Sequence, residues 1–572
     1  MASNSRLHKR NCLFVVFLSQ MLLLVIVLLF SASAIDNKSM TIHQPPIMKL
    51  QVNASRPDSK LSVTEPEFRY VGQEELRDLC QSDVEPVETN PSKSYWQLIT
   101  SNPKQGSPIY IRLTVRSSND KIKAGGGELI YVKMTCKVPS ATQFGKVYNF
   151  DNGTYLIEFN PNWAGETEIQ VTMFLSSRAG YFVRHYDAVN FAFDCVYENT
   201  TTDELHFAHK TMGPLRSSFI KMKKPFGKCR FGTKPFLESK EECGVSVPRH
   251  YWYGTCAKPD DSSCDQISWC YYNKAMSGTE NYLRNKGIIT STNAHQTIRE
   301  KMTKLEKRSI VIHKSDVATP LPSALCSNFS YIRPQGYWLG KVYTNSLCNA
   351  QCDSIPLIKN CLKNSKLLFI GDSTLRIVVD EIRYILRDKR EPLSPLMHFQ
   401  EEFPNLNFSV WYTFHGLPIR TIHSLHFSTT NWTSDILDDI GSTDKLREFD
   451  NVIFNTNHHF ISVPTEMFRL KMKDISDALD RLYKRMPTTR LVYVAANARG
   501  AWSTTQNDYK LRYYNDLARK FLEGKPNVVF LDIWEMFLGS PHKPCVHYPP
   551  DVILEELKLL CSIFRPKRDC TK

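Results

Sequence analysis

The hydrophobic pattern of this 572-residue chain changes partway along, and that change limits the folds it can adopt. From about 66 to 210, apolar residues alternate with polar ones, as at Ile109, Ile111 and Leu113. This period of two predicts short strands. From about 346 onward, short apolar runs alternate with segments of helical periodicity, which predicts an α/β sheet with crossover helices. We therefore expect two unlike folded parts.

The first part is expected to be an antiparallel β-sandwich of immunoglobulin or filamin type over residues 66–210. Alternation recurs at Ile130–Cys136, Tyr155–Phe159 and Ile169–Leu175, and Asp151-Asn152-Gly153 is a hairpin turn signal. Modules of this kind usually bind or space other parts.

The second part, 346–572, predicts strands and helices in alternation. The expected strands are Lys366–Ile370, Asn451–Phe454, Leu491–Val494 and Asn527–Leu531, and the expected helices are Thr374–Leu386, Met467–Arg485 and Gln506–Leu522. Short apolar strands separated by helices are typical of a sheet that is buried on both faces.

Between the two parts, residues 211–345 are rich in cysteine and irregular in pattern. The chain holds 16 cysteines, and in an oxidising compartment such clusters indicate disulfides rather than zinc ligands. Apart from Cys12, which lies in an apolar run, the number is odd, so one free or intermolecular thiol is expected. Residues 35–65 are polar and are expected to form a stem or linker.

The N-terminus carries a targeting signal. Arg6, Lys9 and Arg10 precede an apolar run over Cys12–Ala34. The run is longer than the about 7–15 residues usual in a signal peptide and approaches the roughly 20 that span a bilayer. Residues 1–34 are therefore a signal peptide or a retained signal anchor, and we expect a secreted protein or a Golgi-lumenal type II membrane protein. A membrane contact is expected only through this segment.

Glycosylation motifs agree with a secretory location. Asn-x-Ser/Thr sequons occur at Asn37, Asn53, Asn152, Asn199, Asn328, Asn407 and Asn431. The net charge of +14 is spread along the chain without a basic stripe interleaved with aromatics, so nucleic acid is not expected as a partner. A basic surface suits acidic glycans, although plain surface solubility is the better explanation of it.

One tripeptide could carry chemistry. Gly371-Asp372-Ser373 follows a buried strand and precedes a helix, which puts the serine at the carboxyl edge of the sheet, where open α/β folds bind ligands. The helix N-terminus supplies backbone N–H groups for a developing oxyanion. The alternative is that Asp372 or Ser373 only caps the helix.

A serine nucleophile needs a base, and His547, in a loop after the last strand, is the candidate. Candidate oxyanion and supporting groups are Gly371, Asp372, Ser373 N–H, the His415-Gly416 turn and Asn457. The neighbouring pair His458-His459 has no carboxylate at ligand spacing, so no metal site is expected.

Several stretches together resemble the NXPE family of neurexophilin and PC-esterase domain-containing proteins. Leu367–Arg376, reading Leu-Leu-Phe-Ile-Gly-Asp-Ser-Thr-Leu-Arg, resembles the first block of the PC-esterase branch of the SGNH/GDSL hydrolases. The other similar stretches are Gly145–Tyr155, Trp411–Pro418, Val452–Phe460 and Val546–Pro550, together with Cys561. The resemblance covers roughly residues 70–561.

The resemblance implies an SGNH-like α/β/α domain behind a neurexophilin-like β-sandwich, with esterase or O-acetyl transfer chemistry on glycans, including sialic acids. It makes Ser373 the nucleophile and His547 the base. The sequence departs from the family pattern in two places. Pro544 stands where the branch has the aspartate three residues before the histidine, and Asn457–Phe460 replaces a Gly-Gln-His-Phe block. Asp551 or Asp532 could substitute for the missing acid.

Two functions follow as expectations. The first is an O-acetyltransferase or O-acetylesterase that works through an acyl-serine, without a bound cofactor, and that takes an acetyl donor such as acetyl-CoA if it is a transferase. Its partners would be glycans or cell-surface glycoproteins. The second is a catalytically inactive protein that acts as a neurexophilin-like extracellular ligand for a neurexin-like receptor.

Overall fold

The structure of the protein is a computed structural model. It describes residues 87–185, 192–197, 226–232, 242–272, 294–300, 309–315 and 322–564, apart from single positions and short gaps inside these ranges. The expected targeting segment and stem, 1–34 and 35–65, lie outside the described residues. Residues 65–572 form one compact unit.

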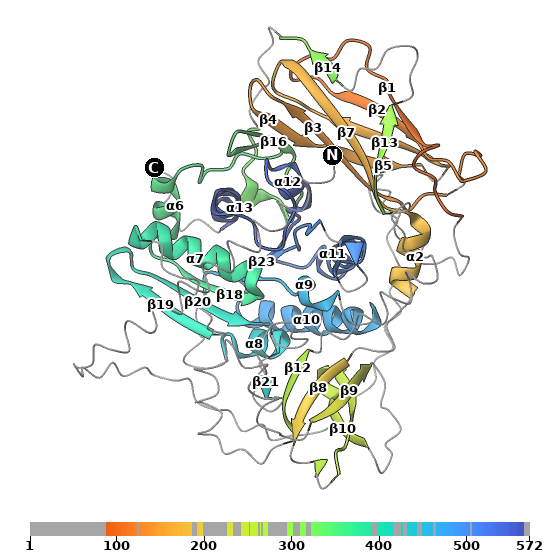
Figure 1. Cartoon of the computed structure of the whole chain (residues 1–572). Helices are drawn as coiled ribbons and strands as arrows, with labels where there is room; N and C mark the ends of the chain where they lie inside the picture. The colour runs from red at the N-terminus through yellow and green to blue at the C-terminus, as the bar shows by residue number, and fades with distance from the viewer. Residues whose placement is uncertain are drawn as a thin grey trace, which may run out of the picture. The chain divides into compact units, whose positions relative to one another are not determined.

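The C-terminal half is built on a seven-stranded sheet (Figure 1). Its strands are β15 (Tyr331–Ile332), β18 (Lys366–Gly371), β19 (His398–Phe403), β20 (Phe408–Phe414), β22 (Asn451–Phe454), β23 (Arg490–Val494) and β26 (Val528–Leu531). Their order is β15-β26-β23-β22-β18-β20-β19, and all neighbours are parallel except β19 and β20. Taken in chain order, the five central strands run 2-1-3-4-5, which is the flavodoxin-like doubly wound order.

Helices cover both faces of this sheet. They are α6 (Ile355–Leu362), α7 (Ser373–Arg387), α8 (Thr433–Asp439), α9 (Asn457–Phe460), α10 (Thr465–Arg485), α11 (Asp508–Leu522), α12 (Trp534–Gly539) and α13 (Pro550–Ile563). Leu368 and Ile370 pack with α8, α10 and α11 in one apolar core, while Leu367 and Phe369 pack with α6, α7 and α13 in another. Successive residues of a strand point to opposite faces, so the unbroken apolar run of β18 fills both cores.

The expected α/β part is confirmed, and each of the four expected strands and three expected helices is observed within two residues of its expected ends. The sheet also contains β15, β19 and β20, which the sequence analysis did not predict. The sheet order places a topological switch point between β18 and β22, because the chain proceeds from β18 to one side and then to the other. Ligands of open α/β sheets bind in the crevice at such a point, outside the carboxyl ends of the strands.

The alternating segments of the first part form strands of an 11-stranded sheet. It contains β1 (Tyr95–Leu98), β2 (Ile109–Thr114), β3 (Leu129–Cys136), β4 (Ala141–Phe144), β5 (Lys146–Asn149), β6 (Thr154–Phe159), β7 (Gly165–Leu175), β13 (Ala294–Glu300), β14 (Ser309–Ile312), β16 (Gly336–Leu339) and β17 (Val342–Asn345). Ile111, Val132, Ile157 and Val171 meet in one buried core. The strands are as expected from the period of two; the immunoglobulin-type or filamin-type sandwich stays a prediction.

The cysteine-rich region contributes to several sheets. Its β13, β14, β16 and β17 belong to the 11-stranded sheet, where β14 pairs with β7, and β15 joins the α/β sheet. A separate six-stranded sheet contains β8 (Ala192–Tyr197), β9 (Phe226–Gly232), β10 (Glu242–Val247), β11 (Trp252–Ala257), β12 (Ile267–Tyr272) and β21 (Leu425–His426). Disulfides join Cys243 to Cys264, Cys326 to Cys348 and Cys352 to Cys361. Cys136 and Cys561 are free thiols, so more than one thiol is unpaired.

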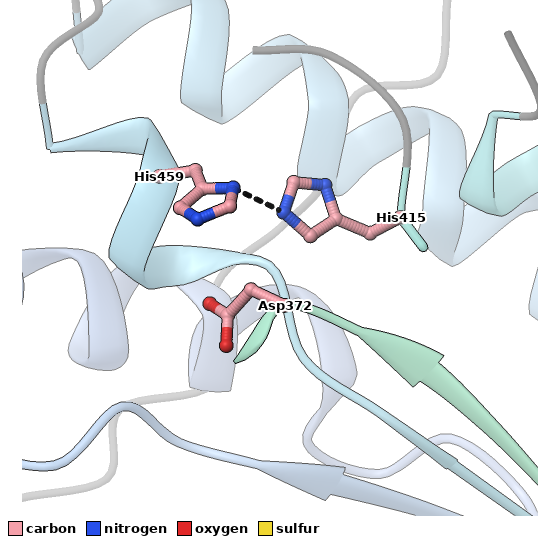
Figure 2. A group of neighbouring side chains, drawn as sticks. All are labelled: Asp372, His415 and His459. Atoms are coloured by element: carbon pink, nitrogen blue, oxygen red, sulfur yellow. Dashed lines mark hydrogen bonds between the residues drawn. The ribbon is translucent and has the colours of Figure 1, made fainter. Parts of the chain in front are cut away.

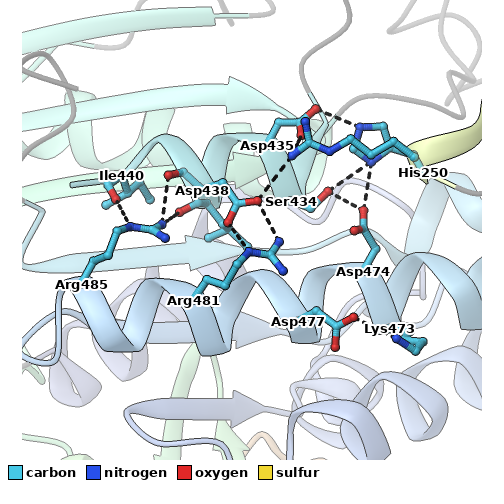
Figure 3. Close-up of polar contacts among 12 residues, drawn as sticks. His250, Ser434, Asp435, Asp438, Ile440, Lys473, Asp474, Asp477, Arg481 and Arg485 are labelled. Atoms are coloured by element: carbon cyan, nitrogen blue, oxygen red, sulfur yellow. Dashed lines mark hydrogen bonds and ion pairs between the residues drawn. The ribbon is translucent and has the colours of Figure 1, made fainter. Parts of the chain in front are cut away.

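A polar network connects the short helix η3 (Pro248–His250) to α8 and α10 (Figure 3). The buried His250 ring contacts Asp474 through Nδ1 at 3.0 Å and Asp435 through Nε2 at 2.9 Å. It also stacks on Trp432 with centroids 4.5 Å apart. Burial raises the pKa of Asp474, but the hydrogen bond from His250 and the charge of Lys471 outweigh it and hold that pKa at about 2.

Remaining elements in the described residues are α2 (Ser177–His185), η6 (Cys326–Asn328), η7 (Pro404–Leu406), β24 (Trp502–Ser503) and β25 (Gln506–Asn507). Three sequon asparagines, Asn152, Asn328 and Asn407, are exposed, whereas the other four lie outside the described residues. No helix that the structure describes is long and apolar enough to cross a membrane.

Candidate active site

The nucleophile-like turn links β18 to α7 at the switch point. Asp372 is the N-cap of α7, and its Oδ1 accepts hydrogen bonds from Thr374 N at 2.8 Å and Thr374 Oγ1 at 2.6 Å. Ser373 is the first residue of the helix and is half-buried. The capping alternative therefore applies to Asp372, and Ser373 is left to face the loop that carries His547.

Both neighbouring strands hold the turn in place. Tyr412, on β20, donates to the carbonyl oxygens of Gly371 at 3.0 Å and Asp372 at 3.1 Å. Asn455, directly after β22, accepts from Asp372 N at 3.1 Å and donates to Thr374 Oγ1 at 2.9 Å. A Cβ at Gly371 would lie 2.4 Å from Asn455 Oδ1, so the close approach requires glycine there.

The two residues proposed as nucleophile and base meet. Ser373 Oγ lies 2.8 Å from His547 Nε2, although they are 174 residues apart in the chain. For the hydroxyl to donate, Nε2 must be unprotonated, so the ring proton sits on Nδ1. Loss of solvent around the ring lowers the pKa of His547, and the charges of Arg376 and Arg499 add to this, while Asp372 opposes it. A neutral imidazole at neutral pH is the form that a general base needs.

The two acids suggested as substitutes lie elsewhere. Asp551 binds His542 Nε2 at 2.8 Å, and Asp532 forms a buried ion pair with Arg512 at 2.9 Å. Within the described part of the chain, no carboxylate hydrogen-bonds to His547. Asp372 is the carboxylate whose charge acts on that ring. We therefore assign the orienting role to neither substitute.

A chain of hydrogen bonds that sequence reasoning missed holds the His547 loop. Arg499 Nε donates to His458 Nδ1 at 2.8 Å, which leaves the proton of His458 on Nε2, and this nitrogen lies 3.0 Å from Asn497 Oδ1. The amide of Asn497 then donates to the carbonyl of Cys545 at 3.1 Å. Burial lowers the pKa of His458 to about 3, so the ring stays neutral and the chain keeps this direction.

Of the expected oxyanion donors, the structure brings only some to the nucleophile. Asn457 is fully buried, and its side chain is engaged by Tyr493 and by Asn515, at 2.5 Å, so its amide faces the core. Gly416 lies outside the described residues. Ser373 N–H, at the start of α7, remains the expected donor that lies beside the nucleophile.

A second cluster lies beside the turn (Figure 2). Asp372, His415 and His459 are all buried, and one potential ligand atom of each lies within 4.8 Å of the others. His415 Nε2 and His459 Nδ1 are 3.1 Å apart. The expectation of no metal site took account only of carboxylates near His458-His459 in the chain. The fold supplies Asp372 from a different strand end.

Comparison with known proteins matches part of this chain to a family. Residues 343–564 match the family model described as NXPE family member 4-like, C-terminal domain. The resemblance expected from Leu367–Arg376 is thereby confirmed for this part, which is less than half of the chain. The neurexophilin-like part upstream stays a prediction.

Solved structures give distant likenesses, each 12% identical. A lipase/acylhydrolase from Enterococcus faecalis covers 36% of this chain and 99% of its own, with a TM-score of 0.23. LAE5, an alpha/beta hydrolase from the metagenome of Lake Arreo, Spain, covers 35% and 95%, with a TM-score of 0.21. An active-site mutant of a family two carbohydrate esterase from Clostridium thermocellum covers 40% and 68%, with a TM-score of 0.23. At these TM-scores the likenesses carry no conclusion about this chain.

Proposed function

We propose that the domain matched over residues 343–564 catalyses serine-dependent acyl transfer, as an O-acetyltransferase or O-acetylesterase acting on glycans. The observation that carries this proposal is the 2.8 Å contact between Ser373 Oγ and His547 Nε2 at the carboxyl edge of the sheet. The match to the NXPE family model supports the same class of chemistry.

The contact defines the steps. His547 Nε2 takes the proton of Ser373 as Oγ attacks the acetyl carbonyl, and the resulting oxyanion lies near the N-terminus of α7. The bond from the carbonyl carbon to the leaving atom, which is oxygen in an ester and sulfur in a thioester, then breaks, and His547 returns the proton to that atom. An acetyl-serine remains. Water or a sugar hydroxyl attacks it with His547 again as base, which gives hydrolysis or transfer and restores the serine.

Arg376 supports an acidic glycan as substrate. It lies one turn after Ser373 on α7 and is half-buried, and its Nε has no hydrogen-bond partner within the described part of the chain. Its charge reaches the reacting pair, because it contributes to the lowered pKa of His547. A guanidinium in this place suits the carboxylate of a sialic acid. For a transferase, the acetyl donor would be a thioester such as acetyl-CoA.

A second function is favoured by the missing acid. In serine proteases, replacing the triad aspartate lowers kcat about 10⁴-fold, and no described carboxylate hydrogen-bonds to His547. A domain that lacks catalytic activity for this reason could be part of an extracellular ligand or adhesion protein that binds a neurexin-like receptor. The disulfides at Cys243, Cys326 and Cys352 suit the secretory pathway for either function.

Labelling by a fluorophosphonate probe separates the two functions. We expect wild-type protein to be labelled at Ser373, and Ser373→Ala to abolish both labelling and any change in cellular glycan O-acetylation. Ser323→Ala, at an exposed serine outside the site and outside every glycosylation motif, is the matched control and should label as wild type does. If wild type stays unlabelled under conditions that label an active esterase, the acyl-transfer proposal is contradicted and the function as an extracellular ligand or adhesion protein remains.

A further inference from the structure

Three adjacent parallel strands direct metal-binding side chains to one point. Asp372 follows β18, His415 follows β20, and His459 lies on α9 after β22. Because β18 is hydrogen-bonded to both β20 and β22, the carboxyl ends of the three strands lie together. Figure 2 shows the three side chains converging, and one ligand atom of each lies within 4.8 Å of the others.

The carboxyl group of Asp372 is buried in this cluster without a paired cation among the described residues. Asp372 is 0% exposed, and none of the described residues offers a hydrogen bond to its Oδ2. No lysine or arginine forms an ion pair with it among the residues that the structure describes. A buried carboxylate normally has a paired charge or coordinates a metal.

The histidines offer the matching ligands. Imidazole nitrogens are common metal ligands, and both rings are buried, with His415 0% and His459 5% exposed. The His415 ring stacks on Phe414 with centroids 4.4 Å apart, and Thr433 Oγ1 holds the backbone of His415 by donating to its carbonyl at 3.1 Å. Ligands that are already held in place lose little freedom on binding.

We propose that Asp372, His415 and His459 bind a divalent transition-metal ion, with zinc as the ion that the ligand set fits best. Two imidazoles and one carboxylate leave a fourth position open in a tetrahedral site. Ligand atoms about 2.0–2.2 Å from zinc lie roughly 3.4 Å apart, and the two histidine nitrogens are already separated by 3.1 Å. A carboxylate oxygen of Asp372, which lies within 4.8 Å of both histidine nitrogens, would be the third ligand. Zinc has no redox chemistry, so it suits an oxidising compartment.

The ion would tie together the three strand ends on which the turn before Ser373 rests. Asp372 would use Oδ1 to cap α7 and Oδ2 to bind the metal, so both oxygens would be satisfied. The site does not depend on the proposed acyl transfer, because Ser373 and His547 are not among its ligands.

The test measures metal content in purified, glycosylated full-length protein. We expect one equivalent of zinc by mass spectrometry of wild type after dialysis against metal-free buffer. His415→Ala and His459→Ala should each lower zinc affinity more than about 100-fold, since even loss of an outer-shell partner costs up to that much. His313→Ala, at an exposed histidine, and Ser373→Ala should keep the metal.

A second measurement covers variants that fail to fold. Wild type stripped with a chelator should regain thermal stability on titration with zinc, because a ligand that binds the native state raises its unfolding temperature. Cobalt in the same site should give the absorption bands of a tetrahedral ion, which zinc removes. Stripped wild type that neither binds zinc nor gains stability would overturn the proposal, as would full zinc content in both histidine variants. If Ser373→Ala loses fluorophosphonate labelling but retains zinc, the metal site and the acyl-transfer activity are independent of each other.

Discussion

At the scale of single residues, the base of the proposed reaction decides the pH dependence. Loss of solvent and the charges of Arg376 and Arg499 lower the pKa of His547, and Asp372 only partly opposes them. A base must be neutral to accept a proton, so a lowered pKa keeps it active further into acid. We expect the acid limb of kcat/KM for an acetyl ester to have its midpoint below the ordinary histidine value of about 6.5.

The comparison variant for this profile is Arg376→Gln. Removing that positive charge should move the acid limb toward higher pH, and it should also raise KM for an anionic substrate more than for a neutral one. An unchanged midpoint would show that Arg376 does not act on His547.

The chain from Arg499 through His458 to Asn497 gives a second prediction. Asn497→Ala removes the donor to the Cys545 carbonyl and loosens the loop that aims His547. A misplacement of about 1 Å can cost roughly 100-fold in rate, so we expect a loss of about that size in kcat with little change in KM. Asn405→Ala, at an exposed asparagine, is the control. Equal losses in both variants would contradict a positioning role.

The reactive pair can be predicted from the sequence, but its surroundings cannot. Ser373 stands out because a glycine-containing turn between a buried strand and a helix has few uses, and His547 because a late loop histidine suits an early serine. The roles of His458, Asn497 and Arg499 depend on side-chain directions at three strand ends, which no local pattern encodes. The sequence predicts that Asp372 caps the helix or supports the serine; its closeness to His415 follows only from the strand order.

At the scale of elements, the short helix η3 is held to α8 and α10 by buried charge. His250→Ala would leave Asp474 buried without its 3.0 Å partner. Breaking a buried pair from one side costs about 3–5 kcal/mol, and we expect a loss near the lower figure in the free energy of unfolding. Arg249→Ala is the matched control: Arg249 contacts Asp435 at 2.9 Å with a side chain 55% exposed, and exposed pairs contribute about 0–1 kcal/mol. Urea titrations that give similar losses for both variants would contradict this difference.

The elements themselves are predictable to different degrees. β18 and β22 can be found because apolar runs of four to six residues bounded by polar ones have few other interpretations. The pairing of β13 with β1 and β7, and of β15 with β26, joins segments far apart in the chain and cannot be read from local periodicity.

At the scale of the whole molecule, polar contacts connect the 11-stranded sheet to the α/β part. Tyr131 donates to Asp508 Oδ2 at 2.8 Å, and Thr142 donates to the Gly539 carbonyl at 2.5 Å. Lys133 adds a contact to the Ser540 carbonyl at 2.5 Å, and burial lowers the pKa of its amine to about 8. These bonds place partners from opposite ends of the chain in one buried boundary, which agrees with a single compact unit over 65–572.

The place of β15 has a practical consequence for recombinant expression. A fragment that begins at residue 343, where the family match starts, lacks β15 and exposes the hydrogen-bonding edge of β26. It also lacks Cys326, so Cys348 becomes an unpaired thiol. Open strand edges template aggregation. We expect 343–564 to form disulfide-linked aggregates in non-reducing gels and light scattering, and 322–564, which keeps both features, to remain mainly monomeric. Equal aggregation of the two fragments would mean that this edge is not what limits solubility.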